Sequence, residues 1–505
     1  MNQDNGGIIG KINTPTTSVA SGVWSLQDQF EAQTSSIWPL AFPQTTIANA
    51  CRFNDGSTDN LTRTPSGASN RKTWTWSGWV KRSTLGASQD LFNAYNPSGF
   101  WERFYFTSGD ILEYDNDIAG SDYTLQSTML FRDTSAWYHL VFAKDTTQST
   151  EADRLKIYVN GSQISLTEVA LGYPPINTDG DINNTYAHDI GKLASGSYFD
   201  GYMTEIIFVD GQQLTPTNFG AFNPVTNIWE PRGYAGTYGT NGFKLNFADS
   251  SALGDDTSGN GNDFTPNNLT SIDQSTDTCS NNFATLNHLT NASYHTLAEG
   301  NLQSFGNTSS DQGNSDSTIS ASSGKWYAEV KCVATNTTGG TASYPRYGIR
   351  HINNKEYGSK LNGGVGSPGK YFANEGLYQC NALKFANDAT SSFGNSFTAN
   401  DIIGIAVDYD NGAVYVSKNG TFQNSGDPTS GSSKTGALLT FTPGDLDGFV
   451  FACAEYNDSK SQWNFGSPPY AISSGNADAN GHGNFEYAVP SDYFALCTKN
   501  LSEHG

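Results

Sequence analysis

Apolar and polar positions alternate over short segments of the chain, and this pattern predicts β-strands. Segments 74–80, 137–143 and 155–159 each place apolar side chains on one alternate set of positions, as a strand with one buried face requires. The last segment ends at Asn160 and Gly161, a pair that favours a tight hairpin turn because both residues tolerate positive φ. Turn residues recur about every eight to twelve positions, which is typical of sandwiches and barrels.

The same alternation returns far downstream and predicts a second sandwich. Its segments are 325–330, 402–409, 413–417, 449–453 and 462–466. A chain of 505 residues is too long for one hydrophobic core and suits several domains of ~100–200 residues. We therefore expect an all-β fold with two similar antiparallel sandwiches in tandem.

One helix is expected, over residues 26–33, where a capping-box pattern precedes the segment. Its apolar face is thin, because only Leu26 and Phe30 lie four positions apart on one side, with Trp24 and Trp38 flanking them. A helix that buries so little needs another surface to pack on. The segment is either a local cap under the first sandwich or a docking element on a larger assembly.

The charge balance excludes several partners. Asp and Glu number 49 against 27 Lys and Arg, which gives a formal net charge of -22. Such a chain repels phosphate backbones and anionic membranes. We expect no nucleic-acid partner and no membrane insertion, since no apolar run approaches ~18 residues and the polar residues 1–5 do not resemble a secretion signal. Six scattered cysteines without a CxxC pair predict buried free thiols rather than a zinc site or a disulfide scaffold.

Motifs for catalysis and for metal binding are incomplete. The chain has no E-x-D-x-x-E run, no G-x-S-x-G elbow and no H-E-x-x-H, and Glu205 is expected to be a lone polar strand residue. Asp179, Asp181 and Asn183 alternate in a turn and offer oxygens for calcium, yet the Gly and Glu of an EF-hand loop are missing. We expect no enzyme activity and no cofactor, with a calcium ion at this turn left open.

Aromatic side chains on loops are the candidate ligand-binding residues. Sugars stack their CH faces on such rings while neighbouring polar groups bind the hydroxyls. Trp101 and Arg103 follow a turn at 97–99. The other candidates lie in Gly- and Asn-rich connections of the second sandwich and are Tyr344, Tyr357, Tyr371 and Tyr378. Ordinary core or rim packing is the alternative for each of them.

Segments 74–80, 137–141, 157–161 and 199–208 follow one another in the order of strands in a known family. On these segments, residues 46–225 resemble the laminin-G-like members of the concanavalin A-like lectin/glucanase superfamily. The resemblance implies an antiparallel jelly-roll sandwich and says little about activity.

Segments 324–330, 347–350, 401–408 and 414–420 fit a related family. On them, residues 318–470 resemble a SPRY (B30.2) domain, which implies a second sandwich of the same kind. Segment 256–263 is similar to a turn that opens many laminin-G-like domains, so strands from about 241 to 290 are candidates for the second sandwich. The expected organisation is a docking or oligomerisation segment, a laminin-G-like sandwich, a connecting region, a SPRY-like sandwich and a tail, over 1–45, 46–230, 231–317, 318–470 and 471–505.

Segments near both ends, 6–11, 21–27 and 493–501, look like the termini of structural proteins from tailed phages. This resemblance implies a virion protein made in the bacterial host cytoplasm, with other virion proteins as partners. The first hypothesis is a homotrimeric tail or capsid fibre, docked by Trp24, Leu26, Phe30 and Trp38, that presents the sandwiches to host-surface polysaccharide. The alternatives are a decoration or connector protein that binds no sugar, and a polysaccharide-degrading enzyme.

Overall fold

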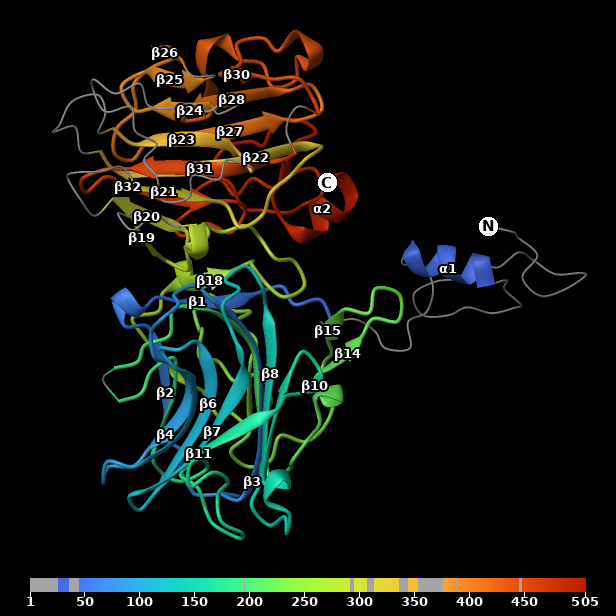
Figure 1. The fold of residues 1–505 in the computed structure, drawn as a ribbon, viewed down its shortest axis with the longest axis vertical. Coiled ribbons are helices and arrows are strands. Elements are labelled where there is room, and N and C mark those ends of the chain that lie inside the picture. The colour runs from blue at the N-terminus through green and yellow to red at the C-terminus, as the bar shows by residue number, and fades with distance from the viewer. Residues whose placement is uncertain are drawn as a thin grey trace, which may run out of the picture.

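The fold consists of two β-sandwiches stacked along the long axis of the molecule, with the N-terminal helix standing apart from both (Figure 1). The computed structural model describes residues 26–35, 45–194, 196–290, 295–306, 313–335, 344–352, 376–386, 389–444 and 447–505. The predicted helix is confirmed as α1 (Leu26–Thr34). Among the described residues, no helix has the length and apolar character needed to cross a membrane.

The first sandwich packs two antiparallel sheets face to face. Sheet A has the strand order β10 (Ser162–Gln163), β9 (Leu155–Val159), β8 (Tyr138–Asp145), β3 (Thr73–Arg82), β13 (Gly201–Asp210), β1 (Ala50–Phe53) and β18 (Gln274–Ser275), with β16 (Phe243–Leu245) also on β13. Sheet B has the order β11 (Leu166–Ala170), β7 (Ser121–Leu130), β6 (Ile111–Ile118), β5 (Trp101–Phe106), β4 (Gln89–Tyr95), β12 (Ala187–Ile190), β2 (Asn60–Arg63) and β17 (Thr265–Asn267).

Aromatic side chains fill the core between sheets A and B. Trp74 and Trp76 of β3 are fully buried there, and Phe104 of β5 stacks on Phe142 of β8 with ring centroids 4.0 Å apart. Trp74, Trp76 and Phe142 come from segments whose alternation predicted strands, whereas Phe104 comes from a segment that was not among the predicted strands. A short hairpin of β14 (Gly220–Phe222) and β15 (Trp229–Pro231) lies beside the sandwich, on the side of α1 (Figure 1).

The connecting region is divided between the sandwiches differently from the prediction. Strands β16, β17 and β18 pair with β13, β2 and β1 of the first sandwich, and Phe243, Leu245 and Phe264 belong to its core. The expected assignment of 241–290 to the second sandwich is therefore wrong as far as Ser275. The physical reason is that β13, β2 and β1 each leave a backbone edge that one of these short strands completes, which a turn motif alone does not reveal.

The second sandwich also consists of two sheets. One contains β19 (His295–Ala298), β20 (Gln303–Gly306), β32 (Lys460–Asn464), β22 (Lys325–Ala334), β27 (Ile402–Asp408), β28 (Ala413–Lys418) and β29 (Thr421–Phe422), with β30 (Leu439–Thr440) on β28 and β33 (Phe494–Ala495) on β22. The other contains β21 (Gly313–Asp316), β31 (Phe449–Glu455), β23 (Arg346–His351), β24 (Gly376–Gln379), β25 (Leu383–Ala386) and β26 (Ala389–Ser392).

Residues 471–505 are part of this second domain rather than a separate tail. Phe485, Tyr493 and Cys497 are buried in its satellite core, and the chain ends in α2 (Thr498–His504). On β22, Glu329 accepts hydrogen bonds from the backbone N–H groups of Glu486 and Tyr487 at 2.9 and 2.8 Å. A buried carboxylate needs such partners, and here they fasten the C-terminal segment to the sheet.

Polar contacts join the two domains. The Nζ atom of Lys81 in the first sandwich lies 2.8 Å from Oδ2 of Asp277 and donates to Oδ1 of Asn282 at 2.7 Å. Both side chains of the Lys81–Asp277 pair are almost fully buried. Nearby, Asn301 of the second domain donates to the backbone carbonyl of Ser83 at 3.0 Å. Because these groups are removed from water, the junction is a specific contact and not a loose linker.

The predicted state of the cysteines is confirmed for five of the six. All six are free, and the buried ones are Cys51, Cys332, Cys380, Cys453 and Cys497. Cys279 is only partly buried.

Candidate functional site on the outer face of sheet B

Strand β5 carries the two residues that the sequence singled out first. Phe104 and Phe106 point into the core, so the alternation of the strand places Trp101, Arg103 and Tyr105 on the opposite, outer face of sheet B. Trp101 and Arg103 were expected on a loop. They belong to a strand because the aromatic residues around them fill the pleated surface between β4 and β6.

Polar residues form one continuous row across this face. Each is the direct cross-strand partner of the next, and the row consists of Thr124, Asp115, Arg103, Asn93, Asp189, Thr62 and Thr265. Directly opposed side chains in antiparallel strands lie ~5 Å apart. The row therefore brings together residues that are up to 203 positions apart in sequence, from Thr62 to Thr265.

Asp115 of β6 organises the centre of the row. Its Oδ2 accepts hydrogen bonds from Nε1 of Trp101 at 2.7 Å and from Nε of Arg103 at 3.4 Å, while Oδ1 accepts from Thr124 at 3.2 Å. The guanidinium of Arg103 lies over the ring of Tyr105 at 3.7 Å and near that of Trp101 at 5.3 Å. Stacking and charge-assisted hydrogen bonds hold this group in one geometry.

Two further carboxylates lie beside this group, one against Arg103 and one against Tyr105. Nη1 of Arg103 lies 3.4 Å from Oδ2 of Asp90, and burial raises the pKa of Asp90 to about 7, although the charge of Arg103 opposes this rise. Glu113 accepts hydrogen bonds from the hydroxyl of Tyr105 and from the amide of Gln126. The face thus combines one guanidinium with three carboxyl groups in a partly buried environment.

Two buried acceptors on this face have no hydrogen-bond partner among the described residues. They are Oδ1 of Asp90 and Oδ1 of Asn93. A buried polar atom left unpaired costs ~1–3 kcal/mol, so the pair marks a place where the folded chain keeps unused hydrogen-bonding capacity.

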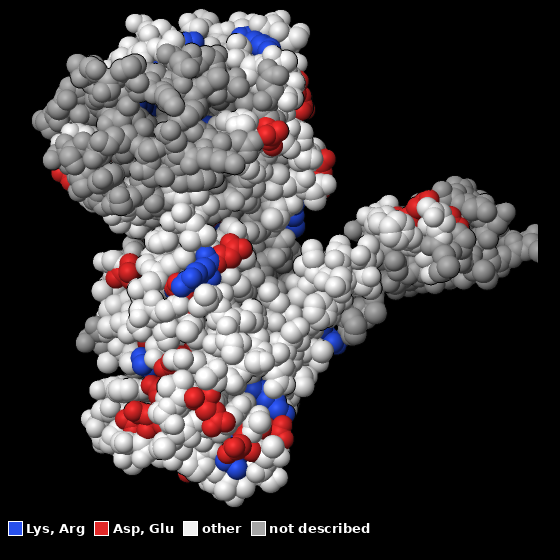
Figure 2. Space-filling view, viewed as in Figure 1, with Lys and Arg blue, Asp and Glu red and all other residues white. Residues whose placement is uncertain are grey.

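A hollow of about 710 Å³ continues the row at the edge of the sheet. Thr62 donates to Oδ1 of Asp189 at 2.6 Å, and Nζ of Lys192 lies 3.7 Å from the same oxygen. Asn262 and Asn267 line the far side of the hollow. Hydroxyl, amide, carboxylate and ammonium groups therefore follow one another from Trp101 to this edge. In Figure 2, acidic side chains are visible around β4, β7 and β11, and the last two strands form the edge of sheet B opposite the hollow.

The carboxylates on this face were not found by motif. Glu113 and Asp115 stand two positions apart on β6, which is the first half of the E-x-D-x-x-E pattern, but the residue that would complete the pattern is Ile118. Both are engaged by hydrogen bonds from neighbouring side chains. Glu205 on β13, expected to be a lone polar residue, forms an ion pair with Lys244 at 2.9 Å.

The tyrosines of the second sandwich do not form an exposed platform. Tyr378 has an exposed fraction of 0% and lies in the core, where its hydroxyl donates to the backbone carbonyl of Asn395. The prediction that it lies on a loop is wrong, because it belongs to β24. Tyr344 is partly buried and packs against the same core. Tyr357 and Tyr371 lie outside the described residues.

Arg71 contacts the turn with alternating Asp and Asn residues. Nη1 and Nη2 of Arg71 each lie 3.7 Å from a carboxylate oxygen, of Asp179 and Asp181 respectively. Asn183 is buried and donates to the carbonyl of Asn70 at 2.7 Å and to Asp210 at 2.9 Å. Among the described residues, no three His, Cys, Asp or Glu side chains gather as a metal site requires.

Of the expected docking residues, Phe30 is the one whose surroundings are described. Its exposed fraction is 57% on α1. Leu26 begins α1, and Trp24 and Trp38 lie outside the described residues. Docking by this segment stays a prediction.

Comparisons with solved structures find low similarity to several sandwiches. The SPRY domain of human HERC1 is 15% identical, with 32% of this chain and 87% of that chain covered and a TM-score of 0.24. A heptameric SAP-like pentraxin from Limulus polyphemus is 16% identical, with 34% and 80% covered and a TM-score of 0.26. A protein of Bacteroides ovatus described as carbohydrate binding is 17% identical, with 46% and 59% covered and a TM-score of 0.30.

No curated protein matches the chain. The predicted fold class, an all-β chain built from concanavalin A-like antiparallel sandwiches, is confirmed. Over residues 55–217, which hold most of sheets A and B, the chain matches the family model of the concanavalin A-like lectin/glucanases superfamily.

Proposed function

We propose that this protein binds glycans without cleaving them, through the polar row on the outer face of sheet B. The observation that carries the proposal is the grouping of Trp101, Arg103 and Asp115 by hydrogen bonds and ring stacking. An indole offers a face to the CH groups of a sugar, and fixed polar groups beside it bind the hydroxyls. The match of residues 55–217 to a superfamily that includes lectins supports this reading.

Binding fits the carboxylates of this face better than hydrolysis. Glycoside cleavage requires a proton donor and a second carboxylate free to act on the sugar. Glu113 and Asp115 instead accept hydrogen bonds from two and three side chains, respectively.

We further propose that the glycans are surface polysaccharides of a bacterial host and that the chain is a fibre or adhesin of a tailed phage. The likeness of segments 6–11, 21–27 and 493–501 to phage structural proteins supports this placement, as does α1, which stands apart from the sandwiches and exposes Phe30 (Figure 1). In this account the N-terminal segment docks on other virion proteins, and the chain forms a homotrimer that needs no cofactor.

The experiment is a binding screen of the purified chain on immobilised bacterial capsular and lipopolysaccharide glycans. The variant Trp101→Ala should weaken binding of the recognised glycan by about tenfold or more, which corresponds to ~1.4 kcal/mol. Leu171→Ala is the matched control, because Leu171 is also an apolar surface residue, 59% exposed. Incubation with the same glycan should release no new reducing ends.

Three results would count against the proposal. If Trp101→Ala leaves glycan binding unchanged, the outer face of sheet B is not the binding site. Release of reducing ends would show that the protein is a polysaccharide-degrading enzyme. If mass spectrometry finds the chain in purified particles while no glycan binds, the protein is a decoration or connector.

A further inference from the structure

A second aromatic cluster lies on the outer face of sheet A, away from the polar row. Its rings follow one another in a line: the ring centroids of Phe222 and Trp229 are 5.0 Å apart, those of Trp229 and His139 5.8 Å, and those of His139 and Trp79 4.9 Å. Trp137 extends the cluster. The hairpin β14–β15 supplies Phe222 and Trp229, whereas β3 and β8 supply the other two rings.

His139 fixes this cluster in one arrangement. Its Nδ1 accepts a hydrogen bond from Nε1 of Trp229 at 3.0 Å. The neutral ring therefore carries its proton on Nε2, which donates to Oγ of Ser77 at 2.9 Å. Burial lowers the pKa of His139 to about 3, so the imidazole is neutral at ordinary pH and the hydrogen-bonded chain persists.

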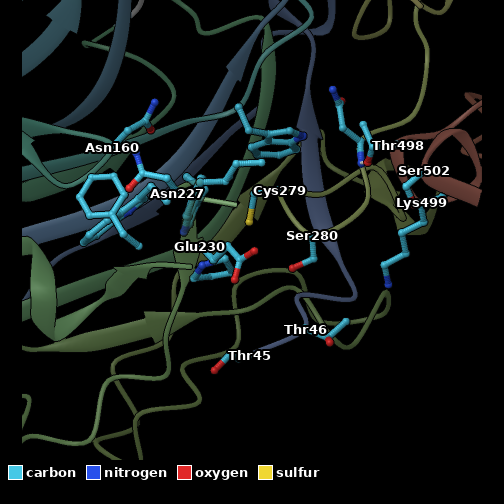
Figure 3. A pocket seen from close by; sticks show the side chains of 17 residues that line it. Thr45, Thr46, Asn160, Asn227, Glu230, Cys279, Ser280, Thr498, Lys499 and Ser502 are labelled. Carbon is cyan, nitrogen blue, oxygen red and sulfur yellow. Dashed lines mark hydrogen bonds between the residues drawn. The ribbon is translucent and has the colours of Figure 1, made fainter. Parts of the chain in front are cut away.

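The cluster forms one wall of a cavity of about 810 Å³ between the two domains. The opposite wall comes from the segment after the first sandwich, with Ser280 and Asn282, and from α2, with Lys499. In Figure 3, Asn227 lies on the left of the view, Glu230 and Ser280 near the middle, and Lys499 of α2 on the right. Sites for small molecules typically have volumes of ~300–1,000 Å³, so the cavity has the size of a ligand site.

The lining specifies the chemistry of a ligand. Aromatic carbon covers one side, which includes Phe222, a residue that is 47% exposed. The other side offers amides and hydroxyls, while the charged side chains are one acid, Glu230, and one base, Lys499. A neutral, hydroxyl-rich molecule with one less polar face matches this division, whereas a strongly charged ligand finds no excess of opposite charge.

We propose that this cavity is a second saccharide site, which takes a short neutral oligosaccharide of two or three sugar units. The site is composite, because the first sandwich provides the aromatic wall and the second domain provides α2. It lies on the opposite face of the first sandwich from the polar row. Two sites on one chain raise the avidity for a repeating polysaccharide when both are engaged.

The test is a titration of the full chain with neutral trisaccharides of glucose, galactose, mannose and N-acetylglucosamine, followed by calorimetry and by indole fluorescence. The variants Phe222→Ala and Asn227→Ala change exposed residues and should each weaken binding by about fivefold to tenfold. Trp101→Ala and Leu171→Ala should leave this binding unchanged. A change of indole fluorescence on binding is expected, because three tryptophans line the cavity.

The outcomes separate this site from the polar row. Loss of trisaccharide binding in Phe222→Ala but not in Trp101→Ala supports the cavity as the saccharide site, even if no polysaccharide binds in the glycan screen. Trisaccharide binding that only Trp101→Ala weakens assigns the sugar to the polar row and overturns the inference. Absence of binding at millimolar trisaccharide, or binding of acidic sugars alone, also overturns it.

Discussion

Trp101 and Asp115 lie on neighbouring strands, and the indole of Trp101 donates a 2.7 Å hydrogen bond to the Asp115 carboxylate on the outer face of sheet B. Arg103 donates to the same oxygen. One carboxylate therefore orients both the aromatic and the cationic group of the proposed glycan site. This arrangement depends on the register of β5 and β6 as much as on the residue types.

Asp115→Asn should weaken glycan binding by about threefold to tenfold. The amide keeps the shape of the side chain but removes the charge that holds Arg103, and hydrogen bonds to charged groups contribute ~1.5–3 kcal/mol. Asp122→Asn is the matched control, since it makes the same change at an exposed position of β7. Titration of the three proteins with the recognised glycan decides the matter, and equal affinities would contradict the role of Asp115.

Lys81→Met should destabilise the protein by ~3–5 kcal/mol, because it leaves the carboxylate of Asp277 buried and unpaired at the domain junction. The control is Lys156→Met. Lys156 pairs with Asp153 at a similar distance, 2.9 Å, on the surface, and such pairs contribute less than ~1 kcal/mol. Thermal unfolding measures both, and equal shifts of Tm would show that the junction pair is not a structural anchor.

Glu455→Gln should change the pH dependence of stability. Burial raises the pKa of Glu455 to about 8, far above its value in the unfolded chain. Between about pH 4.5 and 8, the Glu455 side chain is therefore protonated in the folded state and ionised in the unfolded state. Wild-type stability should fall across this window by up to ~1.4 kcal/mol per pH unit and level off above it.

The glutamine variant lacks this titration and should gain stability relative to wild type as the pH rises from 5.5 to 8.5. Unfolding midpoints at several pH values measure the difference. A constant difference between the two proteins would mean that Glu455 is ionised in the folded state throughout.

Gly161→Ala should destabilise the protein more than Gly120→Ala. Both glycines have positive φ, 82° and 87°, so both substitutions carry a backbone cost of ~1 kcal/mol. A Cβ at Gly161 also meets the ring of Trp229, whereas one at Gly120 meets nothing within 4 Å. The additional overpacking cost is ~1–3 kcal/mol. Equal unfolding midpoints would indicate that Trp229 moves freely, which would weaken the case for a fixed cavity wall.

The strands and cores could be predicted from the sequence because alternation reports directly on burial. Trp74 and Trp76 lie in the first core, as the pattern of 74–80 indicates. Short strands such as β17 and β18 could not be predicted from alternation. Two or three residues carry no periodicity, and their assignment depends on which sheet edge is open to them.

The candidate site was predicted in part. Trp101 and Arg103 were identified as neighbouring candidates, but they were expected on a loop and lie in β5. Asp115, Asn93 and Asp189 join them only through strand register, which local sequence does not encode. The cavity could not be predicted for the same reason, because Trp79, His139 and Trp229 of its aromatic cluster come from three separate elements. Tyr378 shows the opposite error, since an aromatic residue beside Gly and Asn can still point into a core.

The most direct test of the central claim is amide hydrogen exchange of the full chain with and without the recognised polysaccharide. The account predicts slower exchange in β5 (Trp101–Phe106) and β6 (Ile111–Ile118), and the exchange of the second sandwich should stay unchanged outside α2. Protection confined to the second sandwich, with β5 and β6 unaffected at saturating glycan, would contradict the claim that the outer face of sheet B is the binding site.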